Sequence, residues 1–99
     1  MKKINDLPFT ETKQGNIYER IFSENVNESE LKWHFDNEDR LIICEHNTNW
    51  MFQMDNELPV KIEKNKSIFI PEGEYHRIIK GDGDLILKIN KIIPEHRTH

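Results

Sequence analysis

His34 and Asp36 stand two residues apart in a segment, residues 31–36, that alternates strictly between apolar and polar residues. In a β-strand, side chains two positions apart leave the same face, so this imidazole and this carboxylate can point at one cavity. Both groups are ligands for divalent metal ions, and both also form hydrogen bonds with polar ligands. The spacing therefore predicts a polar site on one face of this segment.

A second candidate, His76, follows the turn Pro71-Glu72-Gly73 at the start of another apolar segment. By the same period of two, Lys80 shares a face with His76, and Arg40 shares a face with apolar positions of its own segment. If these faces meet inside a barrel, its interior holds five polar residues: His34, Asp36, Arg40, His76 and Lys80. Burying so many polar groups costs free energy unless they pair with one another, a metal or a ligand, and function is the usual reason.

Two imidazoles and one carboxylate form the ligand set of the facial triad in non-haem iron sites, which leaves other coordination positions open. His34, Asp36 and His76 are therefore the candidate ligands of a divalent metal, with iron, manganese, zinc and nickel all compatible. Arg40 and Lys80 can neutralise Asp36 or hold an anionic small molecule such as a carboxylate. In the alternative, metal-free site, Asp36 forms an ion pair with Arg40, the histidines make ordinary hydrogen bonds and Lys80 is a surface residue.

Short apolar segments separated by turn residues supply the elements that must position these groups. They predict strands over residues 17–22, 31–36, 40–45, 50–54, 60–63, 67–70, 75–80 and 85–90, an edge strand within 1–14 and a frayed end at 94–99. No segment has a convincing helical period. Eight short strands at regular spacing are typical of an all-β sandwich or barrel.

One predicted strand, residues 50–54, carries two further candidates for ligand binding. Trp50 shares a face with Phe52 and Met54, whereas Gln53 shares the opposite face with Met51. One set belongs to the core and the other lines the cavity or a dimer surface, and the sequence does not decide between them. Trp50 and Gln53 are therefore both kept as candidates.

Composition and charge exclude several classes of function. The 99 residues predict a single domain over 1–99, and a core this small makes dimerisation favourable. A net charge of -4 without a basic stripe argues against nucleic acid and anionic membranes as partners. With no apolar run near the roughly 20 residues of a membrane span, and no signal peptide, we expect a cytoplasmic protein. The one cysteine, Cys44, agrees with a reducing compartment and is typical of a small buried hydrophobe.

The second cluster resembles a conserved motif of the cupin superfamily, in which a Gly precedes Pro-x-Gly-x-x-His and an Asn follows it. Residues 71–76, from Pro71 to His76, match the central part of this motif. Asn65 takes the position of the leading glycine, and Lys80 takes that of the final Asn. Because Asn tolerates positive φ, we expect the turn at Asn65 to be retained.

The first cluster resembles the other cupin motif, His-x-His followed by Glu and then Gly, but departs from it more. His34 matches the first His, Asp36 replaces the second, and Arg40 falls where the family has a metal-binding Glu. The resemblance covers about residues 30–90. It implies a jelly-roll β-barrel, an interior metal or ligand site and frequently a dimer. It leaves a three-ligand site of His34, Asp36 and His76, with Arg40 beside the metal or on the substrate.

Three functions follow from these expectations. The first is a small cupin that binds a divalent metal and performs oxidation, isomerisation or a lyase step on an anionic small molecule. The second is a metal-free module that binds a small polar ligand as a sensor or carrier. The third is a structural dimer with a vestigial cavity. In each case we expect a homodimer.

Overall fold

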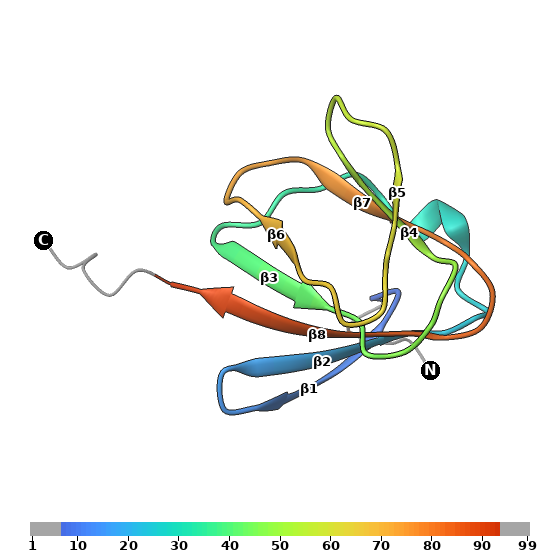
Figure 1. The fold of residues 1–99 in the computed structure, drawn as a ribbon, viewed down its shortest axis with the longest axis horizontal. Helices are drawn as coiled ribbons and strands as arrows, with labels where there is room; N and C mark the ends of the chain where they lie inside the picture. Colours follow the sequence, from blue (N-terminus) through green and yellow to red (C-terminus); the bar gives the residue numbers. More distant parts are fainter. Residues whose placement is uncertain (1–6, 94–99) are drawn as a thin grey trace, which may run out of the picture.

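The computed structural model describes residues 7–93, and almost all of the regular secondary structure there is β-strand (Figure 1). The strands are β1 (Thr10–Gln14), β2 (Ile17–Phe22), β3 (Asp39–Ile43), β4 (Met51–Met54), β5 (Val60–Lys61), β6 (Ile68–Ile70), β7 (His76–Ile79) and β8 (Leu85–Ile92), with one 3₁₀ helix, η1 (Glu28–Glu30). The predicted all-β class is confirmed. The start of the predicted edge strand (1–6) and the predicted frayed end (94–99) lie outside the described residues. No helix within residues 7–93 is long and apolar enough to cross a membrane.

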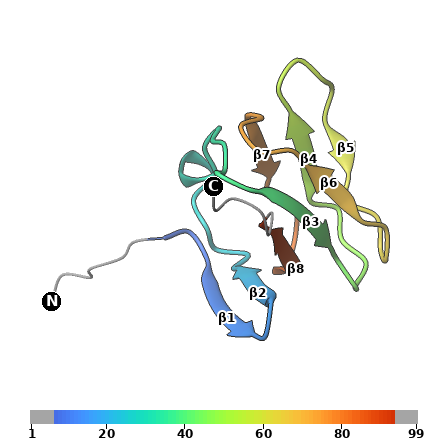
Figure 2. The same cartoon turned by 90° about the vertical axis from the view of Figure 1, so that its left-hand side faces the viewer.

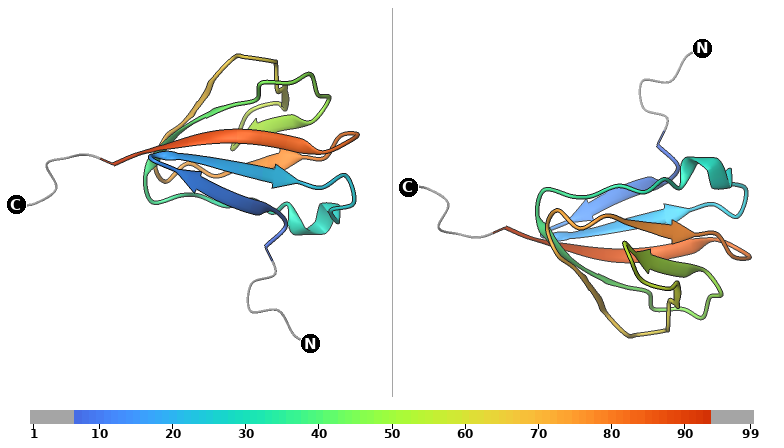
Figure 3. Two further views of the ribbon diagram at one scale, coloured as in Figure 1. Left: turned by 90° about the horizontal axis from the view of Figure 1, so that it is seen from below. Right: turned by 90° about the horizontal axis from the view of Figure 1, so that it is seen from above.

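The strands form two antiparallel sheets. The larger has the order β1-β2-β8-β3-β6 and the smaller the order β5-β4-β7. Figure 2 shows the β1–β2 hairpin and the β4–β5 pair on opposite sides of the molecule. Figure 3 shows η1 at one end of the molecule and the C-terminal end of β8 at the other. The core lies between the sheets, where alternate residues of each strand point inward.

The centre of the core comes from the alternation of β8 and from the segment around β4. Leu85, Leu87 and Ile89 are buried on β8, and Trp50 and Phe52 are buried opposite them. Cys44 is also fully buried, as expected of a small hydrophobe. This interior fixes which strand faces look into the barrel.

The outer face of the larger sheet keeps several apolar side chains exposed. They include Leu41 on β3, Phe69 on β6 and Ile86 on β8. An apolar sheet face of this kind is a possible contact surface. The homodimer stays a prediction.

The segment 31–36 is not the strand that its alternation predicts. Directly before this segment the chain forms η1, capped by the Asn27 side chain, which accepts a hydrogen bond from the Ser29 amide. It then runs on with a single bridge to β7, at His34. The alternation nevertheless places Trp33 and Phe35 at the surface, because side chains alternate in extended backbone even without a ladder.

Each of the two turns of the second motif has a residue with positive φ, which was predicted for the turn at Asn65. Asn65 has a φ of 64°, so it can replace a glycine at a left-handed position. Gly73 has a φ of 82°, which only glycine adopts without strain in the Pro71-Glu72-Gly73 turn.

A close approach at Gly81 provides a first test of the fold. Asn49 and Asp82 hold the loop before β8 to the start of β4 through two hydrogen bonds of 2.9 and 2.7 Å. A Cβ at Gly81 would lie 2.6 Å from the Trp50 amide nitrogen and would also clash with Asn49. We expect Gly81→Ala to lower the free energy of unfolding by about 1 to 3 kcal/mol in urea denaturation. An unchanged unfolding midpoint would contradict this packing.

Candidate metal centre

Backbone hydrogen bonds place His34 and His76 side by side. The His34 amide donates to the His76 carbonyl at 3.0 Å, and the His76 amide donates to the His34 carbonyl at 2.9 Å. Their rings lie with centroids 4.4 Å apart. The two motifs, more than 40 residues apart in sequence, are therefore joined directly by the backbone pairing of His34 and His76.

The turn before β7 is tied to the segment that carries Asp36. The Gly73 amide donates to the Asp36 carbonyl at 3.0 Å, and the Glu72 amide donates to Asp39 Oδ1 at 2.8 Å. These bonds fix the backbone on both sides of the site, so its side chains start from well-defined positions.

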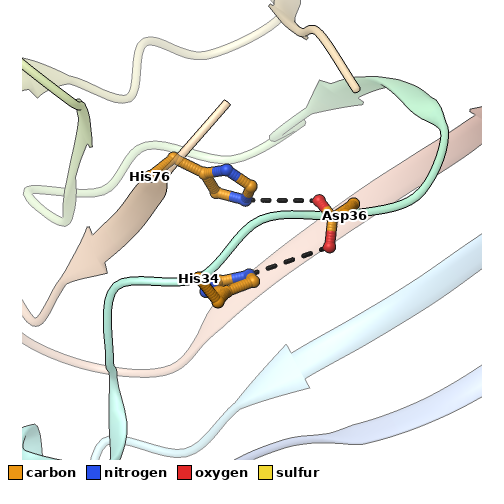
Figure 4. Close-up of side chains that lie close together, drawn as sticks. All are labelled: His34, Asp36 and His76. Atoms are coloured by element: carbon orange, nitrogen blue, oxygen red, sulfur yellow. Dashed lines mark ion pairs between the residues drawn. The ribbon is translucent and has the colours of Figure 1, made fainter. Parts of the chain in front are cut away.

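The side chains of His34, Asp36 and His76 converge (Figure 4). His76 Nε2 lies 3.3 Å from Asp36 Oδ2, and His34 Nε2 lies 3.9 Å from Asp36 Oδ1. One ligand atom from each residue lies within 4.8 Å of the other two. The side chains of Asp36 and His76 are buried, whereas that of His34 is 48% exposed. The three sequence candidates for metal ligation thus form one group that opens to solvent at His34.

The hydrogen bonds of the other ring nitrogens determine which atoms face the carboxylate. His34 Nδ1 lies 2.9 Å from the Lys32 carbonyl, and His76 Nδ1 lies 2.9 Å from the Glu74 carbonyl. Because a carbonyl oxygen only accepts, each Nδ1 must carry the proton and donate it. In the neutral imidazoles, both Nε2 atoms therefore direct lone pairs at Asp36. Hydrogen bonds from Nδ1 to a backbone carbonyl are the contacts that orient histidines which bind a metal through Nε2.

Asp36 carries the negative charge of the site. Burial by itself raises the pKa of its carboxyl, but His76, Arg40 and His34 outweigh burial and bring that pKa below its usual value. The carboxylate is therefore ionised at neutral pH. Oδ2 is the buried side-chain oxygen or nitrogen that makes no hydrogen bond within residues 7–93. Such an atom is costly unless a proton or a cation meets it.

Arg40 lies beside Asp36, but its hydrogen bond goes elsewhere. Its Nε donates to Glu38 Oε2 at 2.6 Å and lies 3.4 Å from Asp36 Oδ2 without a hydrogen bond. The Arg40 Nε–H therefore donates its hydrogen bond to Glu38 and does not donate to Asp36. The arrangement leaves Asp36 Oδ2 open toward the histidines.

The group forms one wall of a cavity of about 260 Å³ between the two sheets. Most of the lining is apolar, from residues that include Phe22, Phe52 and Leu87. Arg20 also lines it, and its guanidinium pairs with Glu11 on β1 at 2.7 Å. Burial lowers the pKa of Arg20, and Glu11 offsets part of this effect. The cavity is thus a low-dielectric space with a polar end.

The structure brings one of the four candidate ligand-binding residues, Arg40, to this cavity. Lys80 follows the end of β7, where the alternation stops, and its Nζ donates to the Val26 carbonyl at 2.9 Å. Trp50 is buried in the core, where its Nε1 donates to the Gly83 carbonyl at 3.0 Å. These two side chains are used for structure.

Gln53 points away from the interior because its neighbour Phe52 points inward and lines the cavity. Its amide donates to the Glu57 carbonyl at 2.8 Å and accepts from Arg77 Nε at 3.0 Å. Gln53 therefore connects two strands of the smaller sheet on the outside.

Sequence reasoning missed two residues of the site, Arg20 and Glu38. Arg20 lies on the same face of β2 as Tyr18 and Phe22. A charged residue between two aromatic residues on one strand face was therefore the signal that could have identified it. Glu38 had no comparable signal, because a carboxylate in a polar turn is normally solvated.

The comparisons with known proteins are informative for the fold. No protein-family model and no curated protein matches this sequence. Among solved structures, the DMSP lyase DddQ from Ruegeria pomeroyi aligns with a TM-score of 0.66 and 13% identity, over 84% of this chain and 40% of that one. The chain therefore spans less than half of that lyase.

Two similar structures have nearly the length of this chain. An RmlC-like cupin with a double-stranded β-helix fold from Methanocaldococcus jannaschii aligns with a TM-score of 0.64 and 11% identity, over 92% of this chain and 86% of that one. A cupin domain from Bordetella pertussis aligns with a TM-score of 0.59 and 15% identity, over 86% and 92%. The chain therefore has the double-stranded β-helix fold of small cupin proteins.

Proposed function

We propose that this protein binds a divalent metal ion through His34, Asp36 and His76, and that its cavity takes a small molecule next to the ion. The observation that supports the proposal is the convergence of three atoms that can donate a lone pair to a metal ion: two Nε2 atoms and the buried Asp36 Oδ2, which makes no hydrogen bond within residues 7–93. When both imidazoles are neutral, the lone pairs of these atoms repel one another. A cation in their midst removes the repulsion and satisfies all three.

The spacing of the donors agrees with a metal. Two ligand atoms about 2.1 Å from one ion at a tetrahedral angle lie about 3.4 Å apart. His76 Nε2 and Asp36 Oδ2 are 3.3 Å apart. His34, the most exposed of the three, is the side chain with most freedom to close its longer distance. Two imidazoles and one carboxylate suit zinc, iron, manganese and nickel, and the donor set does not separate these ions.

A metal held by three protein side chains keeps coordination positions for water or a ligand and can act as a Lewis acid. The chain's own residues then have distinct tasks. The carbonyls of Lys32 and Glu74 hold the imidazoles in the metal-binding tautomer. Glu38 holds Arg40 next to the carboxylate, where the guanidinium can also orient an anionic group.

A metal-free ligand-binding module remains the second candidate, because Arg40 Nε lies 3.4 Å from Asp36 Oδ2. In that case Asp36 would be neutralised by Arg40 alone, and ligand binding would persist in the presence of a chelator. The 2.6 Å hydrogen bond of Arg40 to Glu38 favours the metal site.

Removal of one histidine tests the proposal. We expect Zn²⁺ to raise the melting temperature of the chelator-treated and desalted wild-type protein, and His34→Ala to reduce Zn²⁺ affinity about 100-fold or more. Because His34 is half-exposed, this substitution should leave the fold intact. The measurement is thermal unfolding with and without Zn²⁺, together with metal content by mass spectrometry.

His46→Ala is the matched control, since His46 lies outside the triad. It accepts a hydrogen bond from the Ile86 amide at 3.1 Å. The control should keep the full response to Zn²⁺. A wild-type protein whose melting temperature ignores Zn²⁺, Fe²⁺, Mn²⁺ and Ni²⁺ would rule the proposal out.

A further inference from the structure

We infer that the cavity takes a small monoanion with a hydrocarbon body, such as a straight-chain carboxylate, and takes it only when the triad holds a divalent ion. This inference rests on the proposed metal site and adds the class of ligand. Three features carry it: the charge of the cavity, the nature of its walls and its size.

The positive and negative side chains at the cavity, counted with the carboxylates that pair with its arginines, almost cancel. Arg20 pairs with Glu11 at 2.7 Å, and Arg40 pairs with Glu38 at 2.6 Å. Glu30 and Lys32, which also line the cavity, carry opposite charges. Asp36 also lies 3.4 Å from Arg40 Nε, but Glu38 already balances that guanidinium, so the cavity with neutral histidines has a net charge of about one negative and repels anions.

A divalent ion at His34, Asp36 and His76 changes this charge to about one positive. In a space walled by apolar groups, a single unpaired charge is costly, and a monoanion compensates it in full. A dianion would leave the cavity with a net negative charge, and a protonated amine would be repelled by the positive charge. The charge count therefore selects a monoanion, and selects it only in the metal-loaded protein.

The walls opposite the triad determine the rest of the ligand. Phe22, Ile42, Ile70, Leu87 and Ile89 belong to the core and also line the cavity. They offer no hydrogen-bonding side chains, so the part of the ligand away from the charge must be apolar. At about 30 Å³ per water-sized group, 260 Å³ holds about nine such groups, which corresponds to heptanoate.

Ile78 on β7 is the wall residue whose replacement can test the size. It lines the cavity and is only partly buried, whereas its neighbour Ile79 does not line it. Ile78→Ala should enlarge the cavity, and Ile79→Ala is the matched control that removes the same atoms from outside it.

The experiment is isothermal titration of Zn²⁺-loaded protein with the carboxylates from propionate to decanoate. Affinity should rise about fourfold per methylene up to about heptanoate and then stop rising. Ile78→Ala should move this limit one or two methylenes further, and Ile79→Ala should leave it unchanged. Metal-free protein, and loaded protein given hexylamine or hexanol, should bind at least tenfold more weakly.

Affinity that ignores chain length would mean coordination to exposed zinc alone and would overturn the inference. Equal binding of hexanoate by metal-free protein, or of hexylamine by loaded protein, would overturn it as well. In these outcomes the zinc content of the protein stays at one ion per chain, so the metal site survives. If the chain takes up no zinc at all, the metal site fails, and this inference fails with it.

Discussion

The Asp36→Asn variant is expected to lose nearly all metal-dependent stabilisation while the metal-free protein stays folded. At a metal concentration 100 times the dissociation constant, a bound ion stabilises the native state by about 2.7 kcal/mol. For a domain of this size, that raises the melting temperature by on the order of 10 °C. Without the charged oxygen, we expect at least a 100-fold weaker affinity. The same metal concentration should then stabilise the variant by less than about 0.5 kcal/mol.

The metal-free variant should keep its stability because asparagine has the shape of aspartate and brings a donor. In the wild-type protein, Asp36 Oδ2 lies 3.3 Å from His76 Nε2, and in the neutral tautomer with the proton on Nδ1 no proton lies between these two atoms. An amide nitrogen in the place of Oδ2 can donate to the His76 lone pair. The gain of this hydrogen bond offsets the lost attraction to Arg40, so we expect a change within about 1 kcal/mol.

The measurement is urea unfolding of both proteins with saturating Zn²⁺ and with chelator. A full response of Asp36→Asn to Zn²⁺ would remove Asp36 from the ligand set. A loss of several kcal/mol in the chelated variant would show instead that the Asp36–Arg40 pair stabilises the fold, as in the metal-free alternative.

The candidate site shows which features a sequence of this kind can predict. The period of two placed His34 and Asp36 on one side even though their segment pairs with β7 at one bridge only. Turn chemistry was equally predictable, because the motif needs a left-handed residue at Asn65 and at Gly73, and both have positive φ. These are properties of short stretches of backbone, which local sequence determines.

The same rules could not predict which strand face is buried in the core or which ion-pair partner a charged side chain takes. The alternation predicts that Trp50 and Gln53 lie on opposite faces of their strand. It does not predict which face is buried, and the packing of the two sheets places Trp50 in the core. Lys80 lies one residue beyond β7, where the period no longer holds. Whether Arg40 pairs with Asp36 or Glu38 depends on differences below 1 Å between contacts of 3.4 and 2.6 Å. Such choices come from tertiary structure, to which pattern reasoning has no access.

Arg40 itself gives the second large effect. Arginine Nε and a glutamate Oε stand the same number of bonds from Cα, so Arg40→Glu would put a carboxylate oxygen where Nε now lies, 3.4 Å from Asp36 Oδ2. That distance suits two ligands of one ion. The change also replaces a positive by a negative charge beside a divalent cation. We expect at least a 100-fold gain in Zn²⁺ affinity, measured by competition with a chromophoric chelator.

The same substitution should lower the stability of the metal-free protein. Asp36, Glu38 and the introduced carboxylate would then lie together without the guanidinium, so the chelated variant should lose about 3 kcal/mol of unfolding free energy. Arg40→Gln is the control, because it has the same reach and no charge, and it should be intermediate in both measurements. The metal-free alternative predicts the same loss of stability for the chelated variant, together with a wild-type protein whose stability does not change on adding Zn²⁺. Recovery of the Arg40→Glu variant by metal would show that Asp36 and its neighbours can hold a cation, and the wild-type response to Zn²⁺ in the same assay then separates the two functions.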